Sequence, residues 1–324
     1  MRLIVDSDGA IDDAAALLWL CGNPDIDIVA VTAVGGSVPA EQAAANLRVI
    51  LEAAGADDVP VFVGSSPSGP APRTRRPVTI HGHDGLADVR RPAARRPPET
   101  SRSATEALAE YCRDGIGVLA LGPMTNLAAA VGSGAMQSAE ARLTFMGGSA
   151  AAGGNARPSS EANIAHDPAA ADTVLRSPWA EPPLMVGLDV THAATFTEHE
   201  FAALMARQTP AAEFLADRLS FYQRNAGMLC APGETPCHDL VAAMACADPT
   251  LLTSELLGVQ VDVGGSSAWG ATVVDMRPLA RRVHKRPGGE EEGNAAGDGT
   301  PVRVALEADV DRFRSAVRTF FLNL

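Results

Sequence analysis

The chain has 324 residues, of which 46% are hydrophobic and 4% aromatic, and its formal net charge at pH 7 is −13. A chain of this length can bury a large core, here built mainly from Ala, Val and Leu. The negative charge argues against nucleic-acid backbones and anionic membranes as partners, but it leaves a small neutral substrate open.

Targeting signals and cysteine chemistry point to the cytoplasm. No apolar run approaches the roughly 18 residues that a membrane-spanning helix needs, and the first residues do not resemble a signal peptide. The cysteines contain no CxxC pair and are odd in number, which predicts neither a zinc site nor a disulfide framework and favours a reducing compartment. They are Cys21, Cys112, Cys230, Cys237 and Cys246.

Strand-like and helix-like segments alternate from the N-terminus onward. β-branched or apolar runs predict strands at residues 3–5, 28–34, 60–63, 117–121, 142–146 and 184–188. Helices are expected at residues 12–21 and 39–54 and between several later strands, with a final strand and helix at the C-terminus. This order predicts an α/β fold, a single domain over residues 1–324 with a mostly parallel central sheet flanked by helices. Residues 286–300, rich in Gly and Glu, are expected to form a flexible insertion.

Polar and glycine residues follow the predicted strands at matching positions. In parallel sheets the loops at the carboxyl ends of the strands hold ligands. These ends carry Asp6-Ser7-Asp8, Gly35-Gly36-Ser37, residues 122–126, Gly147-Gly148 and Asp189. The loops at this edge are therefore expected to form the functional site.

The densest of these motifs is residues 6–13, DSDGAIDD, which carries four aspartates in eight positions. Four carboxylates at a strand-to-helix turn repel one another unless a counter-charge is present. The partial positive charge at the N-terminus of the following helix stabilises Asp12 and Asp13, but it cannot balance the charges of all four carboxylates. Hard cations such as Ca²⁺ or Mg²⁺ take oxygen ligands, so the motif favours a metal site over a solvated acidic turn.

Two weaker motifs lie further along the chain. Residues 237–244 read as a helix start with His238 and Asp239 at its mouth, a pattern that a simple helix cap also explains. The other weaker motif contains Asn155, Glu161 and Asn163. The hydrogen-bond donors and acceptors of these side chains suit the vicinal hydroxyls of a sugar, and they also fit an ordinary polar loop.

The ordered set of motifs resembles the calcium-dependent nucleoside hydrolases of the inosine-uridine-preferring type over nearly the whole chain. Any one motif is weak, whereas the set in this order is specific. The motifs are residues 6–13, VTAVGG at 31–36 with Asn46, IHGHDG at 80–85, LGPMTNLA at 121–128, MGG at 146–148, GN at 154–155, EANI at 161–164 with Asp167-Pro168, His238-Asp239, and WGATVVD at 269–275.

The resemblance implies a role for each matching residue. Asp8, Asp13, Asp239 and the backbone carbonyl of Thr125 would hold Ca²⁺, with a metal-bound water as nucleophile and Asp8 as its base. The sugar would be held by Asp12, Ser37, Asn155, Glu161 and Asn163, and His238, with His81, would face the leaving base. The implied reaction is hydrolysis of the N-glycosidic bond of a ribonucleoside or related N-riboside, which builds positive charge on the sugar that nearby carboxylates stabilise.

The motif set departs from the family pattern in the aspartate motif, where all four aspartates are kept, and in the residues expected to contact the substrate. Gly9-Ala10 replaces Pro-Gly, Ser37 replaces an Asn that contacts the sugar, and Ala162 replaces an aromatic. A hydroxyl shorter than the amide would reach the sugar only through a water or a shifted loop. None of the three tryptophans lies in a loop that matches the base-stacking tryptophans of purine-specific relatives.

Two other functions fit parts of the pattern. A strand followed by DxD also occurs in aspartyl phosphatases, but that chemistry uses a lysine, and Lys285, the only lysine, lies beside the predicted insertion. The alternative is a catalytically drifted family member that binds a ribosyl ligand or acts as a structural protein. Relatives form homodimers or homotetramers, and the same assembly is expected here.

Overall fold

The first strand, β1 (Arg2–Ser7), lies inside a nine-stranded sheet and carries its neighbours β2 and β4 in parallel register on either side. The computed structural model describes residues 1–68, 80–113, 115–226, 231–277 and 297–324. Within these residues the strand order is β10-β9-β11-β6-β5-β4-β1-β2-β3. All pairs from β3 to β11 are parallel, whereas β9 is antiparallel to both of its neighbours. The other strands are β2 (Asp27–Ala33), β3 (Val61–Val63), β4 (Gly117–Ala120), β5 (Arg142–Met146), β6 (Leu184–Val186), β9 (Leu252–Val261), β10 (Thr272–Val274) and β11 (Thr300–Ala308).

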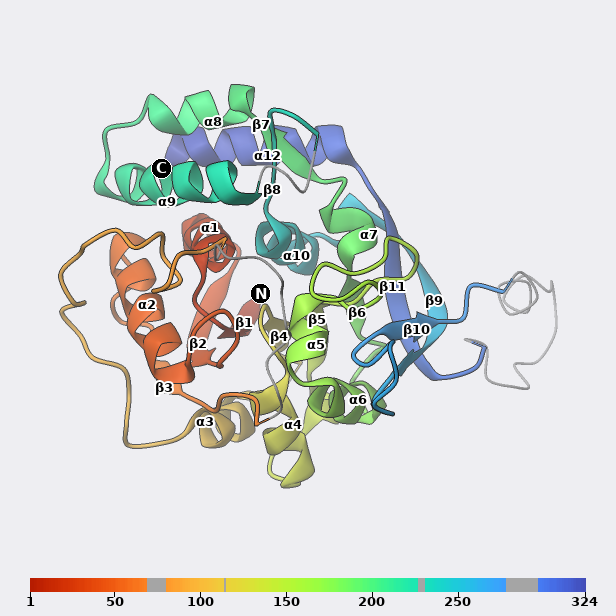
Figure 1. Cartoon of the computed structure of the whole chain (residues 1–324). Coiled ribbons are helices and arrows are strands. Elements are labelled where there is room, and N and C mark those ends of the chain that lie inside the picture. The colour runs from red at the N-terminus through yellow and green to blue at the C-terminus, as the bar shows by residue number, and fades with distance from the viewer. Residues whose placement is uncertain (69–79, 114, 227–230, 278–296) are drawn as a thin grey trace.

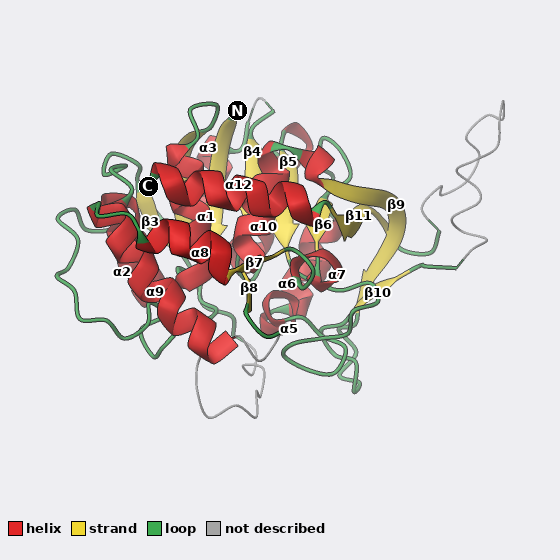
Figure 2. Ribbon diagram, turned by 90° about the horizontal axis from the view of Figure 1, so that it is seen from above, coloured by secondary structure: helices red, strands yellow, loops and turns green. Residues whose placement is uncertain are grey.

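Helices cover both faces of this sheet (Figures 1 and 2). One face packs against α1 (Ile11–Gly22), α2 (Ala40–Ala53), α9 (Pro210–Ala226), α10 (His238–Ala247) and α12 (Val310–Asn323). The other face packs against α3 (Ala104–Tyr111), α4 (Thr125–Gly132) and α6 (Pro168–Arg176). The remaining elements are α5 (Ala162–His166), α7 (Leu188–Thr191), α8 (Glu198–Met205), the 3₁₀ turns Ser138–Glu140 and Pro249–Leu251, and the hairpin of β7 (Thr195–Thr197) and β8 (Glu234–Pro236).

The two-sided packing follows from the sequence of the strands. In β1 the buried side chains of Leu3 and Val5 point into one core, while Ile4 between them points into the other. A strand covered on both faces buries every residue, so its apolar residues form a continuous run and do not alternate with polar ones. The same feature explains why the parallel sheet could be predicted from short apolar segments.

The predicted α/β fold with a mostly parallel central sheet is confirmed. The strand at 142–146 has the predicted bounds, and the others agree within a residue or two. One prediction was too long: β6 ends at Val186, because Gly187 starts the short helix α7 and places Leu188 in it. The predicted insertion at 286–300 lies outside the described residues up to residue 296, and β11 already begins at Thr300. Among the described residues, no helix is both long and apolar enough to cross a membrane.

Candidate active site

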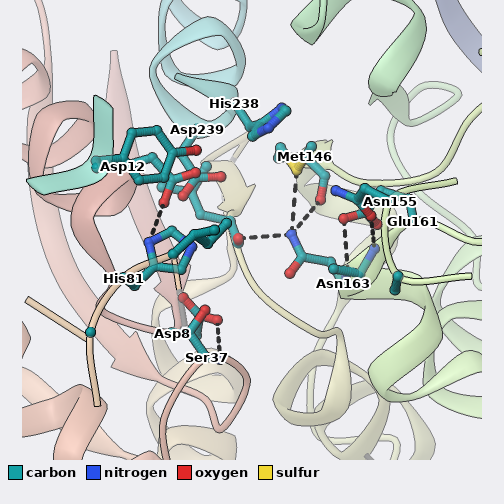
Figure 3. A pocket seen from close by; sticks show the side chains of 16 residues that line it. Asp8, Asp12, Ser37, His81, Met146, Asn155, Glu161, Asn163, His238 and Asp239 are labelled. Atoms are coloured by element: carbon teal, nitrogen blue, oxygen red, sulfur yellow. Dashed lines mark hydrogen bonds and ion pairs between the residues drawn. The ribbon is translucent and has the colours of Figure 1, made fainter. Parts of the chain in front are cut away.

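A cavity of about 240 Å³ opens where β1, β2, β4 and β5 end, at the carboxyl edge of the parallel strands. Segments far apart in the sequence meet there (Figure 3). Asp12, His81 and Asp239 lie on one side of it, Asn155, Glu161 and Asn163 lie on the other, and His238 lies between them. The lining residues are Asp8, Asp12, Ser37, Ile80, His81, Gly82, Leu121, Met146, Asn155, Ala156, Glu161, Ala162, Asn163, Tyr222, His238 and Asp239.

A group of buried carboxylates lies at one side of this cavity. One oxygen each of Asp12, Asp13 and Asp239 lies within 4.8 Å of the others, and all three side chains are buried. Asp12 and Asp13 stand in the first turn of α1 and Asp239 in that of α10, two helices that pack together. Asp8, at the end of β1, is also buried and raises the pKa of both Asp12 and Asp239 through its charge. We refer to Asp8, Asp12, Asp13 and Asp239 as the carboxylate group.

Few protein donors offset the charge of the carboxylate group. The backbone N–H of Ser37 donates to Oδ2 of Asp8 at 2.6 Å, and that of Ala10 donates to Oδ2 of Asp13 at 2.9 Å, with the Ser7 hydroxyl on its other oxygen. Burial, followed by repulsion from neighbouring carboxylates, raises the pKa of all four members. A cation that binds several carboxylate oxygens relieves both effects. The donor set of this structure therefore fits a hard divalent ion.

The backbone around Asp8 is shaped to admit its side chain. A Cβ atom on Gly36 would lie 2.3 Å from Oδ2 of Asp8, so only glycine fits at that position. Gly9 turns the chain from β1 to α1 with a φ of +67°. The amide of Asn46 fixes that turn by donating to the carbonyl of Gly9 at 2.9 Å and to that of Asp84 at 2.8 Å. These contacts tie the aspartate motif to α2 and to the HGHDG loop.

Glu161, Asn155 and Asn163 on the opposite side are held by the backbone. The Glu161 carboxylate accepts the N–H of Asn163 at 2.8 Å and those of Gly148 and Ile164 at 3.1 Å each, and it caps α5. The Asn163 amide donates to the carbonyls of Leu121 at 2.9 Å and Met146 at 3.1 Å, at the ends of β4 and β5. Asn155 accepts the N–H of Ala162. Burial raises the pKa of Glu161 to about 7 despite these bonds.

Two histidines complete the cavity. Nδ1 of His238 lies 2.8 Å from the hydroxyl oxygen of Thr191, and the ring of His192 meets that of His238 edge to face with centroids 5.6 Å apart. Burial, with the nearby His192 and His81, lowers the pKa of His238 to about 3, so its ring is neutral near pH 7. His81 stacks on Tyr222 at 5.3 Å between centroids, and its Nδ1 lies 3.7 Å from Oδ1 of Asp12.

The structure brings together the residues singled out in the sequence, with two exceptions at the cavity wall. Asp8, Asp12, Ser37, His81, Asn155, Glu161, Asn163, His238 and Asp239 line the cavity, whereas Asp13 and Thr125 do not. Asp13 lies behind the wall, within the carboxylate group, and the Thr125 hydroxyl donates to Asp167. Asp12 lies among the three close carboxylates, although the sequence placed it with the sugar ligands. The roles of all these residues in metal binding, substrate binding and catalysis stay predictions.

Some contacts could not be anticipated from the sequence. Thr191 contacts His238 across 47 positions of chain, and the only signal was its place just after a strand end. Asp189, which the sequence placed at the same strand end, instead accepts the backbone N–H groups of Ala150, Ala151 and Ala152 and so shapes the neighbouring loop.

Comparisons with known proteins identify the family of this chain. A family model described as inosine-uridine preferring nucleoside hydrolase matches residues 3–315. The chain is 32% identical to uridine nucleosidase 1 of Arabidopsis thaliana (85% of this chain, 82% of the relative) and 31% identical to an inosine-uridine preferring nucleoside hydrolase of Leishmania major (96% and 94%). The solved structure of a purine-preferring ribonucleoside hydrolase from Gardnerella vaginalis is similar with a TM-score of 0.82 and 31% identity, covering 99% of this chain and 98% of that one. The chain therefore belongs to the inosine-uridine preferring nucleoside hydrolase family.

Proposed function

We propose that this protein is a Ca²⁺-dependent enzyme that hydrolyses the N-glycosidic bond of ribonucleosides or related N-ribosides to free base and ribose. The observation that carries the proposal is the cavity itself, in which Asp8, Asp12 and Asp239 face Glu161, Asn155 and Asn163 with His238 between them. Its relatives are nucleoside hydrolases by name, and they differ in the base they name.

The carboxylate group supports the metal requirement. Asp13 and Asp239 would hold Ca²⁺, and an oxygen of Asp12 lies within 4.8 Å of theirs. Asp8 and the Thr125 carbonyl are proposed as further ligands. When bound, Ca²⁺ would orient sugar hydroxyls and lower the pKa of a water molecule. Asp8 would accept the proton of the water that attacks the anomeric carbon, because it lines the cavity and one of its oxygens is already fixed by the Ser37 N–H.

Glu161, Asn155 and Asn163 support recognition of a sugar. Because Asn163 uses its amide N–H groups on backbone carbonyls, its oxygen is left to accept a hydroxyl of the ligand. As the bond to the base breaks, positive charge develops on the sugar ring, and the carboxylates of Asp12 and Glu161 on its two sides would stabilise that charge.

His238 and His81 would face the leaving base. The bond's electron pair leaves with the base, water adds to the sugar carbon, and the base takes up one proton, so the atoms of the reaction balance. Because His238 is neutral in the free protein, it would act on the base as a hydrogen-bond donor, as a neutral imidazole does when it polarises a substrate atom.

The experiment that tests the proposal is ribose release from a panel of purine and pyrimidine ribonucleosides in Ca²⁺, beside an Asp8→Ala control. We expect release from at least one nucleoside, its loss in the control, and its loss on chelation with return on adding Ca²⁺. Protein that binds Ca²⁺ but releases no ribose from any member of the panel would contradict the proposal. That result would instead support the alternative of a ribosyl-ligand-binding protein.

We also propose a cytoplasmic homodimer or homotetramer. The four described cysteines, Cys21, Cys112, Cys237 and Cys246, are free thiols, which supports a reducing compartment. Most soluble oligomers are homo-oligomers with closed symmetry. Light scattering of the purified protein tests the assembly directly, and a monomer at micromolar concentration would contradict it.

A further inference from the structure

The hydrogen bond between Thr191 and His238 joins the end of α7 to the first residue of α10. Thr191 is fully buried, and its hydroxyl oxygen lies 2.8 Å from Nδ1 of His238. The other ring nitrogen, Nε2, has no protein partner in the described part of the chain, and the side chain lines the cavity. His238 therefore has one nitrogen fixed by the fold and one left for a ligand.

The direction of this bond follows from what the hydroxyl needs. Within the described residues, Thr191 Oγ1 has no contact other than Nδ1 of His238 that could accept its hydrogen. Leaving a buried O–H without an acceptor is unfavourable, so the hydroxyl donates and Nδ1 accepts. An imidazole nitrogen that accepts carries no hydrogen, and the single ring hydrogen must then sit on Nε2.

We propose that Thr191 is a positioning residue for the leaving base: its hydroxyl donates to Nδ1 of His238 and so keeps a hydrogen on Nε2, directed into the cavity. This inference rests on the proposed hydrolase function. In the step concerned, the electron pair of the N-glycosidic bond moves onto the base, and the Nε2–H group forms a hydrogen bond to the base atom that gains this charge. The hydrogen stays on His238, and solvent completes protonation of the base.

The neighbouring His192 does not replace Thr191 as the hydrogen-bond partner of Nδ1 of His238. His192 meets His238 edge to face, and its own Nε2 is buried without a hydrogen-bond partner among the described residues, so it does not hold Nδ1. With Thr191 replaced by an apolar residue, both tautomers and a rotated ring become accessible. The cavity would then face a lone pair in part of the molecules, and a lone pair repels a base that gains negative charge.

The first test is spectroscopic and does not need turnover. ¹⁵N NMR of the histidine side chains, with His238 assigned by its absence in His238→Gln, distinguishes a nitrogen that carries hydrogen from one that does not. We expect Nδ1 of His238 to be bare and Nε2 to carry the hydrogen, and we expect Thr191→Val to mix the two forms. The opposite tautomer in the wild-type protein would overturn the proposal, whether or not the protein hydrolyses nucleosides.

The second test uses the dependence of rate on the leaving group. Thr191→Val is expected to lower kcat on the best ribonucleoside about 10- to 100-fold, part of what a positioned acid–base group contributes. On a nitrophenyl riboside, whose leaving group needs no hydrogen bond, the loss should stay below about threefold. Thr191→Ser keeps the hydroxyl and should restore most of the nucleoside rate.

A matched control separates positioning from general damage. Thr195 is equally buried, and its hydroxyl donates to Glu234 at 2.9 Å, outside the set of cavity-lining residues. Thr195→Val should change the two rates by the same factor. Equal losses on both substrates in Thr191→Val, or no loss on either, would overturn the proposal. If the wild-type protein cleaves neither substrate, the hydrolase proposal fails, and the NMR result still decides the tautomer.

Discussion

The two sides of the cavity are built on opposite principles. Glu161 spreads its charge over three backbone N–H groups, and Asn163 and Asn155 are likewise bonded to the main chain. The carboxylate group has few such partners, and burial, followed by the charges of its own members, raises the pKa values of all four. The first arrangement is complete without a ligand, whereas the second needs a bound cation or protonation of its carboxylates.

This difference bears on how the two sides respond to change. A self-sufficient side can lose one polar contact and still present the others, and it is on this side that the departure Ala162 occurs in the sequence. A side whose members repel one another depends on the cation that we propose it binds. Variants on the two sides should therefore differ in Ca²⁺ dependence more than in fold.

The largest effect is expected from Asp239→Asn. Loss of this carboxylate should weaken Ca²⁺ binding at least about 100-fold, because a metal ligand matters more than a residue that only hydrogen-bonds to a ligand. The same variant should lower kcat/KM about 10³-fold. Because one of several repelling charges is gone, the chelated variant should melt at a higher temperature than the chelated wild type. Calorimetric titration with Ca²⁺ and thermal melts measure both. Asp311→Asn, in the exposed first turn of α12, is the matched control; a similar result there would contradict the assignment.

A smaller loss is expected from Glu161→Gln on the opposite side. The oxygen of the Gln amide still accepts a hydrogen bond, but its NH2 group would face a backbone N–H. The free energy of unfolding should therefore fall by about 1 to 3 kcal/mol. Because the negative charge is lost as well, kcat/KM should fall about 100-fold. Ca²⁺ affinity should change less than about threefold. Glu200→Gln is the control, because Glu200 is a buried capping carboxylate that does not line the cavity. A large drop in Ca²⁺ affinity in Glu161→Gln would show that the two sides are not independent.

Stability should depend on pH differently with and without metal. Burial, then the charge of Asp8, raises the pKa of Asp12 from 3.8 to about 7. The folded state thus holds a proton that the unfolded chain has lost, so the stability of the chelated protein should fall as pH rises from about 4 to about 7. Ca²⁺ favours the ionised carboxylates, and at a hundredfold excess over Kd it adds about 2.7 kcal/mol.

Melting curves at pH 5 and pH 8, in chelator and in Ca²⁺, measure this linkage. The increase in melting temperature on adding Ca²⁺ should be larger at pH 8 than at pH 5. An increase that is equal at both values would mean that the carboxylate group is already ionised without metal. The same melting curves in Mg²⁺ show which of the two hard cations, Ca²⁺ or Mg²⁺, the protein binds more tightly, a choice that the aspartate motif alone leaves open.

The sequence predicted the strands well because a strand buried on both faces leaves a continuous apolar run, as at residues 3–5 in β1. It also predicted which loops meet, because parallel strands end at one edge. The details of the site depended on geometry that no local pattern carries. The turn at Gly9 decides that Asp12 lies within 4.8 Å of Asp239, and the arrangement of α7 and α10 decides that Thr191 contacts His238.

The smallest effect is expected at Ser37, which lies beside Asp8 of the carboxylate group. Its backbone N–H already holds Asp8, while its side chain is exposed at the cavity rim, so Ser37→Ala should leave KM within about twofold. Ser37→Asn adds an amide that can reach a sugar hydroxyl directly, and one net hydrogen bond of about 0.5 to 1.5 kcal/mol corresponds to a KM about 2- to 10-fold lower. Steady-state kinetics on the best nucleoside measures both. A higher KM in Ser37→Asn would mean that the open rim is occupied by a substrate group larger than a ribose hydroxyl, and the substrate would then be sought among substituted N-ribosides.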